Sequence, residues 1–241
     1  MSTSVTAAAL RAQKRTLRKS MATTLKGLSD ASVDEQSALL TTRLLQSPLI
    51  SRAQNVALYL GMPHGEVRTD ALARALIERG KTLYLPRIVP IEPPVAAQLA
   101  VPSAPSTKMV MLKIQNIDDL SAIQPSGPWG LREPTLDGRE SASTLDLILC
   151  PGVAFDRSLP HPQRLGHGKG YYDTFIRSLS TPTTSSHTSI VGRQPILVAL
   201  ALREQLLDAG AVPTDALDVP LDFVVTPMEW FPSEPKSTSS A

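Results

Sequence analysis

The segment Leu145–Leu149 is the feature that most restricts how this chain can fold. Four of its five residues are apolar and it has the length of a strand. Strands of this kind lie at the centre of parallel sheets, where helices cover both faces. A glycine-rich stretch, Arg164–Asp173, follows it, and a helical pattern extends over Tyr171–Leu179. A buried strand followed by a glycine-rich turn and a helix is typical of α/β proteins.

Short apolar segments alternate with helical patterns along the rest of the chain. We expect helices over residues 6–28, 33–45, 69–79, 171–179 and 203–207. We expect strands over residues 56–60, 82–85, 109–114, 145–149, 196–200 and 223–226. Ser32 and Glu35 form a candidate capping box for the second helix. Pro48 is expected to end that helix, and Pro86 to end the second strand. The alternation predicts a mostly parallel sheet covered by helices on both faces.

Three loops are expected to meet at one edge of this sheet. Gly61–Glu66 follows the first strand, Pro151–Tyr172 follows the strand over 145–149, and a further connection follows Leu200. Ligands of parallel sheets bind beyond the carboxyl ends of the strands. We therefore expect these loops to converge on one cleft.

The stretch Arg164–Asp173 carries the strongest chemical signal. Glycines at alternate positions permit positive φ, and the start of a helix presents backbone N–H groups to an anion. Arg164, His167 and Lys169 add donors, and Asp173 offers an oxygen that Mg²⁺ accepts. The spacing matches neither a Walker A motif nor a dinucleotide fingerprint. The alternative is a tight connection with exposed charges, but the interleaved cations favour phosphate binding.

Composition excludes several function classes. A net charge of +2 gives no reason to expect non-specific nucleic-acid binding, and no apolar run reaches the length of a transmembrane helix. The single cysteine, Cys150, excludes an intrachain disulfide and a cysteine-rich zinc site, and it is expected to be a buried apolar side chain. Among the histidines, His64, His161 and His187 lack the spacing of metal ligands.

Several other candidate residues could be functional, but each also has an ordinary structural explanation. Lys14 and Arg18 share one face of the first helix, which by itself is typical of a solvated basic surface. Glu66 by itself would be an exposed loop acid. Trp129 can cover a planar heterocycle or fill the core. Turn formation is the ordinary role of three acids near the last strand, namely Asp215, Asp218 and Asp222.

Residues 1–29 are basic and contain no acid. This composition resembles a mitochondrial transit peptide. The alternative is a helix of the working protein whose basic face has a function.

Four segments together resemble the 5-formyltetrahydrofolate cyclo-ligase (methenyltetrahydrofolate synthetase) family. They are the basic segment Lys14–Arg18, the strand-loop-glutamate segment Leu60–Thr69, the tryptophan turn Gly127–Pro134, and the signature Pro151–Asp156 with Arg164–Asp173. The resemblance runs from about Lys14 to Thr226. It implies an α/β fold of three layers, α/β/α, with a mostly parallel, Rossmann-like sheet.

The resemblance also implies a reaction. ATP and Mg²⁺ drive the cyclisation of 5-formyltetrahydrofolate to 5,10-methenyltetrahydrofolate, with release of ADP and phosphate. The formyl oxygen attacks the γ-phosphate, a phosphorylated intermediate forms, N10 adds to the activated carbon, and phosphate leaves. Phosphoryl transfer requires positioning and charge neutralisation more than covalent help from the protein.

Roles for individual residues follow from the same resemblance. The implied ATP-binding residues are Lys14, Arg18, Arg164, Leu165, Gly166, His167, Gly168, Lys169, Gly170, Tyr171 and Tyr172. The implied folate-binding residues are Leu60, Glu66, Trp129, His167, Gly168, Lys169, Gly170 and Tyr171. The implied catalytic residues are Lys169, Arg164 and Tyr172. The implied Mg²⁺ ligands are Asp173 and Asp218, with Asp215 or Asp222 as alternatives to Asp218. His167 stands where relatives often carry Arg or Tyr, so its own role stays open.

We expect a single cyclo-ligase domain over residues 1–231, with loop insertions at 88–107 and 180–195 and a disordered tail over 232–241. The expected partners are 5-formyltetrahydrofolate and ATP, without nucleic acid or membrane, and the expected state is a monomer. Contact of Lys14 and Arg18 with ATP would make the basic helix part of the working enzyme. This favours the cytoplasm, with the mitochondrion as the alternative.

Overall fold

The computed structural model describes residues 6–91, 106–127, 130–180 and 194–233. The helices are α1 (Ala7–Lys26), α2 (Asp30–Gln46), α3 (Pro48–Arg52), α4 (Asp70–Glu78), α5 (Ile117–Ser121) and α6 (Tyr171–Ser180). The strands are β1 (Asn55–Ala57), β2 (Thr82–Pro90), β3 (Thr107–Lys113), β4 (Pro125–Ser126), β5 (Leu131–Arg132), β6 (Leu147–Cys150), β7 (Ala154–Asp156), β8 (Arg164–Leu165), β9 (Ile196–Leu200), β10 (Leu206–Leu207), β11 (Phe223–Val225) and β12 (Trp230–Phe231). A 3₁₀ turn, η1, covers Arg203–Gln205.

The main sheet of the described residues has seven strands in the order β12-β11-β9-β6-β1-β2-β3. The inner strands pair in parallel, from β11 through β9, β6 and β1 to β2. The edge strands β3 and β12 pair antiparallel to their neighbours. β6 lies between β1 and β9, so the segment Leu145–Leu149 does lie at the centre of a parallel sheet, as predicted.

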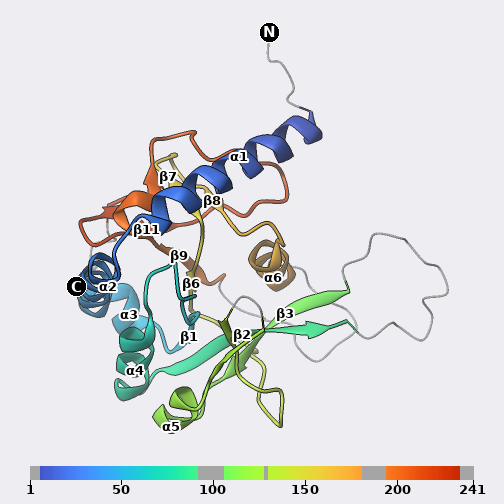
Figure 1. Ribbon diagram of the computed structural model, residues 1–241. Coiled ribbons are helices and arrows are strands. Elements are labelled where there is room, and N and C mark those ends of the chain that lie inside the picture. Colours follow the sequence, from blue (N-terminus) through green and yellow to red (C-terminus); the bar gives the residue numbers. More distant parts are fainter. Residues whose placement is uncertain (1–5, 92–105, 128–129, 181–193, 234–241) are drawn as a thin grey trace, which may run out of the picture.

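Helices cover both faces of this sheet. Successive side chains of β6 point to opposite faces. Leu147 and Leu149 therefore belong to one core, together with residues of α1, α2 and α4. Ile148 and Cys150 belong to a second core, together with residues of α6. Figure 1 shows α2, α3 and α4 on one side of the sheet and α6 on the other. The three-layer α/β/α prediction is confirmed.

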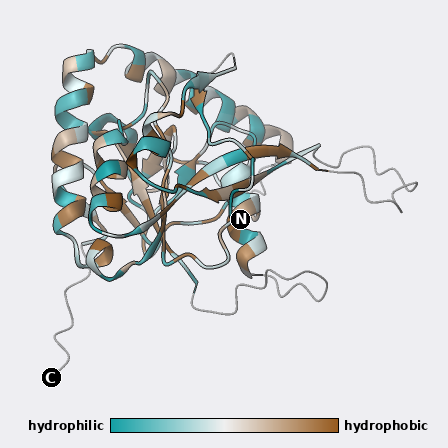
Figure 2. Ribbon diagram, turned by 90° about the horizontal axis from the view of Figure 1, so that it is seen from below, coloured by the Kyte–Doolittle hydropathy of each residue, from teal (hydrophilic) through white to brown (hydrophobic). Residues whose placement is uncertain are grey.

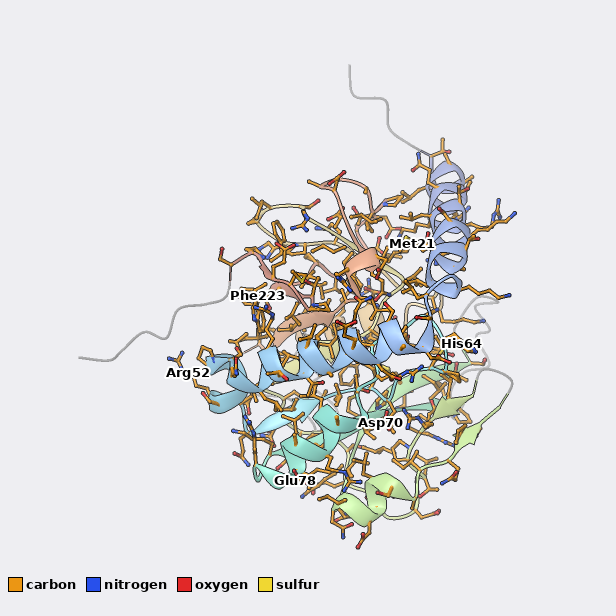
Figure 3. The ribbon with its side chains drawn as sticks, turned by 60° about the vertical axis from the view of Figure 1, so that its left-hand side comes forward. Met21, Arg52, His64, Asp70, Glu78 and Phe223 are labelled. Carbon is orange, nitrogen blue, oxygen red and sulfur yellow. The ribbon has the colours of Figure 1, made fainter. Side chains whose placement is uncertain are left out.

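Hydropathy follows the layers. In Figure 2 the outer helices carry both hydrophilic and hydrophobic colours, as expected for elements with one buried face. α1 packs by its C-terminal half, where Met21 and Leu25 are buried. Figure 3 shows Met21 on the side of α1 that faces the body of the protein. The N-terminal half of α1 contains no buried residue, so its side chains can contact other parts of the chain.

Two predictions about the ends of α2 need correction. α2 begins at Asp30, three residues earlier than expected, because the hydroxyl of Ser29 accepts from the N–H of Ser32 at 3.2 Å and caps the helix there. Pro48 does not simply close α2. It occupies the first turn of a further helix, α3, which the hydroxyl of Ser47 caps.

β2 continues through Pro86 to Pro90, so the prediction that Pro86 ends the strand was wrong. Beyond Tyr84, β2 pairs only with β3. The N–H of Ile88 points away from β3, since it donates to Oε1 of Glu133 at 3.1 Å. Pro86 lies two residues earlier and has the same orientation, so the N–H that it lacks is not needed by the ladder. Part of the expected insertion 88–107 is therefore strand.

The connections near the site are more complex than predicted. The helix expected over 203–207 is only the short turn η1, and Leu206 and Leu207 form β10. Two strands of a small sheet with the order β10-β7-β8, namely β7 and β8, come between β6 and the glycine-rich loop along the chain. The loop therefore follows the β7–β8 hairpin rather than β6 itself. Strands of two or three residues carry too little periodicity for sequence patterns to find them.

Some predictions fall outside the described residues. These include Trp129, most of the two expected insertions (residues 92–105 and 181–193) and most of the expected tail (residues 234–241). In the part of the chain that is described, no helix combines the length and apolarity needed to cross a membrane.

The strand order places the ligand-binding edge. The chain moves from β1 to β2 on one side, and from β6 through β9 to β11 on the other. A crevice is expected outside the carboxyl ends of β1 and β6, where these directions diverge. The loops after β1, β6 and β9 do meet there, because the side-chain amide of Gln205 donates to the carbonyls of Gly152 at 2.7 Å and Gly65 at 3.3 Å.

Candidate active site

A cavity of about 480 Å³ opens at this edge of the sheet. Its walls come from the end of β1 and the loop after it, from β2 and β3, and from the glycine-rich loop with the first turn of α6. The lining residues are Tyr59, Leu60, Met62, Glu66, Pro86, Ile88, Met109, Leu131, Arg132, Glu133, Pro151, Arg164, Gly166, His167, Lys169, Gly170, Tyr171, Tyr172 and Asp173. The cavity thus brings together most of the residues that the sequence singled out.

The glycine-rich loop keeps its backbone donors unused. Among the described residues, no hydrogen bond has a backbone N–H of residues 166–173 as its donor. The first intrahelical bond at this end of α6 is made by Thr174, which donates to the carbonyl of Gly170 at 2.9 Å. Unpaired N–H groups in a loop and at the start of a helix are the usual components of an anion site.

Gly168 shows why the loop requires glycine. Its φ is +96°, a region that side chains rarely adopt. A Cβ at this position would also lie 3.3 Å from Cζ of Arg18. The loop therefore passes directly against a cationic side chain of α1.

Arg164 is a buried cation at the back of the cavity, with its side chain 4 % exposed. Its Nη2 donates to Oδ1 of Asp173 at 2.8 Å, and its Nη1 donates to the carbonyl of Pro151 at 3.4 Å. The guanidinium lies 5.5 Å from the ring centre of Tyr172. Its Nε is buried and has no partner among the described residues. The charge is thus only partly used by the protein.

α1 brings two more cations to the loop. Nε of Arg18 donates to the carbonyl of Gly166 at 2.8 Å. Nζ of Lys14 lies 3.0 Å from Asp215 and 2.5 Å from Asp218. Burial by itself lowers the pKa of Lys14, but bonds to the two carboxylates outweigh it and raise that pKa above its ordinary 10.5. The basic face predicted on α1 therefore docks on the site.

The loop after β1 is held by a network around Glu66, a buried acid. Oε2 of Glu66 accepts from the N–H of Met62 at 2.9 Å, and the hydroxyl of Thr69 donates to the carbonyl of Tyr59. Nε2 of His167 lies 3.1 Å from Oε1 of Glu66. This contact joins the glycine-rich loop to the loop after β1. It places His167 at the junction, whereas the sequence left its role open.

Unsatisfied donors gather at the cavity. Within the described residues, the buried side-chain atoms without a partner include Oη of Tyr59, Nε of Arg164 and Oη of Tyr172. All three belong to residues that line the cavity. Burial raises the pKa of both phenols well above 10, so they remain protonated donors. Buried donors normally have partners, and here the missing partners would be acceptors on a ligand.

Sequence reasoning missed part of this wall. The sequence identifies Tyr59 only as a strand residue, although it lies next to Leu60. Glu133 lines the cavity and lies 3.3 Å from Nη1 of Arg87 on β2. The ion pair with Arg87 explains how the carboxylate of Glu133 is accommodated in the wall of the cavity. The Gly-Pro-Trp-Gly turn indicates its neighbourhood, but only the folded chain brings Glu133 to β2, where it meets Arg87 and the N–H of Ile88.

The remaining predicted residues take different places. Lys169 is exposed and pairs with no described residue. The side chain of Leu165 is buried in the core, so a ligand would meet only its backbone. The hydroxyl of Tyr171 lies 2.9 Å from that of Thr107 on β3. Cys150 is buried and its pKa is raised to about 12 by burial, which confirms that it is an apolar core residue.

The expected metal ligands have protein partners. Oδ1 of Asp173 accepts from Arg164 and from the N–H of Val219 at 3.1 Å. Asp218, one residue before Val219, holds Lys14. Oδ2 of Asp222 accepts from the N–H of Leu197 near the amino end of β9, away from the loops. No group of three His, Cys, Asp or Glu side chains within the described ranges is arranged to hold a metal.

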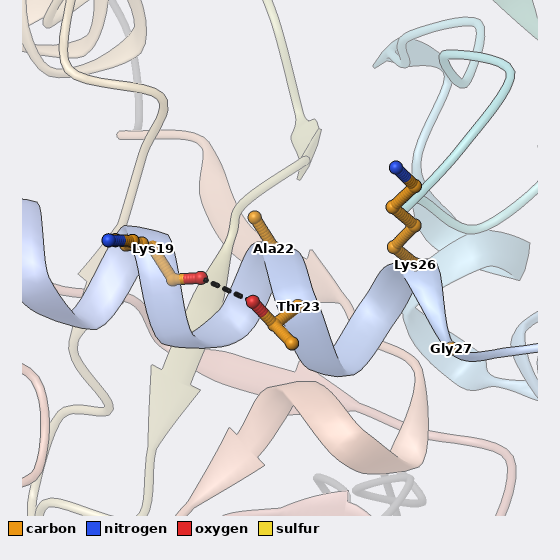
Figure 4. A pocket seen from close by; sticks show the side chains of 5 residues that line it. All are labelled: Lys19, Ala22, Thr23, Lys26 and Gly27. Atoms are coloured by element: carbon orange, nitrogen blue, oxygen red, sulfur yellow. Dashed lines mark hydrogen bonds between the residues drawn. The ribbon is translucent and has the colours of Figure 1, made fainter.

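A second hollow, of about 450 Å³, lies along α1 and is lined by Lys19, Ala22, Thr23, Lys26 and Gly27. Figure 4 shows that all of these side chains come from the helix and its C-terminal cap, with the hydroxyl of Thr23 bonded to the carbonyl of Lys19. Its walls belong to one element and carry no acid or aromatic group, so it offers no convergent chemistry.

Residues 10–227 match the model of the 5-formyltetrahydrofolate cyclo-ligase family. A protein of Schizosaccharomyces pombe named probable 5-formyltetrahydrofolate cyclo-ligase is 31% identical, with 89% of this chain and 95% of that protein covered. A mitochondrial 5-formyltetrahydrofolate cyclo-ligase of Arabidopsis thaliana is 26% identical, with 95% of this chain and 79% of that protein covered.

The fold is also similar to solved structures. The 5,10-methenyltetrahydrofolate synthetase of Aquifex aeolicus matches with a TM-score of 0.64 and 24% identity, covering 95% of this chain and 99% of that one. At this identity the similarity concerns the fold. It supports the arrangement of sheet and helices in Figure 1.

Proposed function

The chain belongs to the 5-formyltetrahydrofolate cyclo-ligase family, and on this premise we propose that it cyclises 5-formyltetrahydrofolate to 5,10-methenyltetrahydrofolate, using Mg²⁺ and ATP. In this reaction the formyl oxygen forms a bond to the γ-phosphorus, and the bond from that phosphorus to ADP breaks. N10 then attacks the formyl carbon and loses its proton. The carbon–oxygen bond breaks, and phosphate leaves with the former formyl oxygen.

One observation carries the ATP part of this proposal, namely the row of unused backbone N–H groups over residues 166–173. Cations surround this row, with Arg164 behind it, Lys169 within it and Arg18 bonded to the carbonyl of Gly166. A triphosphate is rich in acceptors and negative charge, so it matches both features. Lys14 and its two acids position the start of α1 beside this row.

The cavity next to the row supports the folate part. Leu60, Met62, Ile88 and Met109 provide apolar walls, which suit a flat heterocycle. Glu66 provides one buried carboxylate. A carboxylate in such a wall is the natural acceptor for the N–H groups of an aminopyrimidine ring. We propose that Glu66 holds the pterin there, with Leu60, Trp129 and the facing side of the glycine loop (His167, Gly168, Lys169, Gly170 and Tyr171) as further folate contacts.

The donor set fits a magnesium ion that is bound mainly by phosphate. Mg²⁺ usually takes one or two carboxylates and completes its shell with phosphate oxygens and water. Oδ1 of Asp173 is engaged by Arg164 and Val219, whereas Oδ2 accepts no hydrogen bond from any described residue. We propose Asp173 as the carboxylate that would hold the ion, with Asp218 nearby. When bound, Mg²⁺ would neutralise phosphate charge.

The proposed catalytic residues act by charge and position. Arg164 places a fixed positive charge beside the loop, and the ring of Tyr172 and the carboxylate of Asp173 hold it in place. Lys169 has no described protein partner and is available to the γ-phosphate. The hydroxyl of Tyr172 is a neutral donor at physiological pH. Donors fixed in advance of the reaction stabilise transferring charge without reorganising during the reaction.

We propose that α1 is kept in the working protein, because its cations dock on the glycine-rich loop. Removal of this helix as a transit peptide would break the contacts of Lys14 and Arg18. This favours the cytoplasm, although a relative is named mitochondrial. The single domain over residues 1–231 and the monomeric state stay predictions.

The proposal is tested by following the absorbance of the methenyl product in the near ultraviolet. Purified protein is mixed with 5-formyltetrahydrofolate and Mg-ATP, and the controls omit ATP or add excess chelator. Product is expected only in the complete mixture. Product without ATP, or none in the complete mixture, would refute the proposed reaction. Binding of both ligands without turnover would point instead to a binding protein.

A further inference from the structure

We propose that the hydroxyl of Tyr59 is a specificity-determining donor, which binds the ring carbonyl oxygen of the heterocycle in the cavity. The inference rests on the proposed function, because the heterocycle in question is the 2-amino-4-oxo ring of a reduced folate. It assigns a role to a residue that no sequence motif singled out.

The backbone position of Tyr59 is firmly set. The residue lies just beyond the carboxyl end of β1, at the point where the directions of the chain diverge. Its carbonyl accepts from the hydroxyl of Thr69 at 2.5 Å, and the preceding N–H, of Leu58, donates to the carbonyl of Tyr84 at 2.9 Å. A side chain on this anchored backbone is pre-positioned for a ligand.

The Tyr59 side chain is 4 % exposed, and its hydroxyl is buried without a partner among the described residues. The ring packs in the same core as Leu58 and Leu60. Packing alone would be served equally by phenylalanine, since the hydroxyl makes no contact that holds the fold together. A buried and unpaired hydroxyl costs free energy that a ligand acceptor would recover.

The surroundings of Tyr59 indicate which acceptor fits. Burial, and secondarily the charge of Glu66, raise the pKa of the phenol, so it stays a neutral donor. Tyr59 and Glu66 line the same cavity, so a donor and an acceptor stand near each other. A 2-amino-4-oxo pyrimidine presents the matching pattern on one edge, with a carbonyl oxygen beside a ring N–H and an amino group.

Tyr172 is the other unpaired phenol of the cavity, but its position differs. Its ring lies against the guanidinium of Arg164, next to the first turn of α6. That contact ties Tyr172 to the phosphate side. Glu66 acts on both phenols, but of the two only Tyr172 has a cation against its ring. We therefore assign the carbonyl-reading role to Tyr59.

The experiment compares Tyr59→Phe with a matched control, Tyr84→Phe. Tyr84 is equally buried at 4 % but belongs to the other core and does not line the cavity. Titration calorimetry measures the Kd of three ligands, namely 5-formyltetrahydrofolate, its 4-amino analogue in which the carbonyl is replaced, and ATP.

Wild-type protein is expected to prefer the 4-oxo ligand over the 4-amino analogue. Tyr59→Phe is expected to raise the Kd of the 4-oxo ligand by about tenfold, which is the effect of losing one buried hydrogen bond. The analogue and ATP should change by less than about twofold, on the same basis. Tyr84→Phe should leave all three values unchanged.

Several results would overturn the inference. Equal loss of the two folates in Tyr59→Phe would indicate a packing role, and no loss at all would indicate no role. If Tyr59→Phe does not fold, the test rests on the ratio of the two Kd values for wild-type protein. Equal wild-type affinity for the 4-oxo and 4-amino ligands would then contradict the inference. Failure of wild-type protein to bind any reduced folate would refute the proposed function itself, which is a separate outcome.

Discussion

The two sides of the site are built by different means. The phosphate side consists of backbone N–H groups over residues 166–173 and of cations that approach from outside the loop. The folate side consists of buried side chains that the sheet holds in place, with Glu66 and Tyr59 among apolar neighbours. The phosphate side can recognise any molecule with the right charges, whereas the folate side recognises a shape and a pattern of donors and acceptors. Variants on each side should therefore affect different ligands.

Arg164→Met should have the largest effect, because this residue belongs to both the fold and the phosphate side. It leaves Asp173 partly buried without its charge partner, which costs about 3 kcal/mol in the free energy of unfolding. Turnover should fall by at least about a hundredfold, as for the loss of a preorganised charge. Urea unfolding and steady-state rates measure the two effects. Unchanged stability would contradict the structural part of this account.

Lys169→Ala should weaken the phosphate side more than the folate side, although Lys169 is proposed to contact both ligands. The side chain is exposed and pairs with no described residue, so stability should stay within about 0.5 kcal/mol. The Kd for ATP should rise by about tenfold or more, as expected for a charge-assisted bond, while the Kd for the folate changes far less. Titration with each ligand gives the comparison. Equal weakening of both would remove Lys169 from its proposed role.

Glu66→Gln should produce the opposite pattern. A carboxamide offers one acceptor instead of two, so folate binding should weaken by about tenfold, the effect of a charged hydrogen bond. ATP binding should be unaffected. Glu78→Gln, at the end of α4, is the matched control on the surface. A loss of ATP affinity in Glu66→Gln would break the proposed division of the site.

Gly168→Ala tests whether the shape of the loop matters apart from its charges. The φ of +96° and the nearby Arg18 make a Cβ unfavourable, and we expect ATP affinity to fall by about fivefold, equivalent to about 1 kcal/mol of strain. Gly138→Ala is the control, since φ there is +63° and a Cβ meets open space. Comparable loss of ATP affinity in both variants would indicate a general backbone effect.

The smallest expected effect concerns acid stability away from the site. Hydrogen bonds from Arg139, at 2.5 and 2.6 Å, lower the pKa of Asp119 below its ordinary 3.8. A lowered folded-state pKa stabilises the protein above the unfolded value, and this stability is lost as pH falls through the folded value. Asp119→Asn should therefore remove about 1 kcal/mol at neutral pH, and less as the pH falls below the ordinary pKa of 3.8. Urea unfolding at several pH values measures this, and a constant difference would contradict it.

Much of the fold could be predicted from the sequence. Apolar periodicity identified β6 and β9 and placed β6 at the centre of a parallel sheet. It could not identify β7, β8 or β10, because strands of two or three residues show no period. The prediction that Pro86 ends β2 was wrong, because proline is tolerated where the neighbouring strand does not need its backbone N–H. The sequence of one strand does not show on which side a neighbour lies.

The candidate site was predictable where function resides in a local motif. Arg164–Asp173 and the pair Lys14 and Arg18 were visible in the sequence. The contact of Arg18 with Gly166, and that of His167 with Glu66, join segments that are more than a hundred residues apart. The unpaired hydroxyl of Tyr59 was not predictable, because only the packed structure determines which buried donors lack partners.

The central claim is that phosphoryl transfer from ATP on one side of the site drives ring closure on the other. The most direct measurement follows ADP and the methenyl product in the same reaction with wild-type protein. The account predicts one ADP for each methenyl product, with negligible ADP when the folate is omitted. Ring closure without ADP, or ADP formation at a rate independent of the folate, would contradict it.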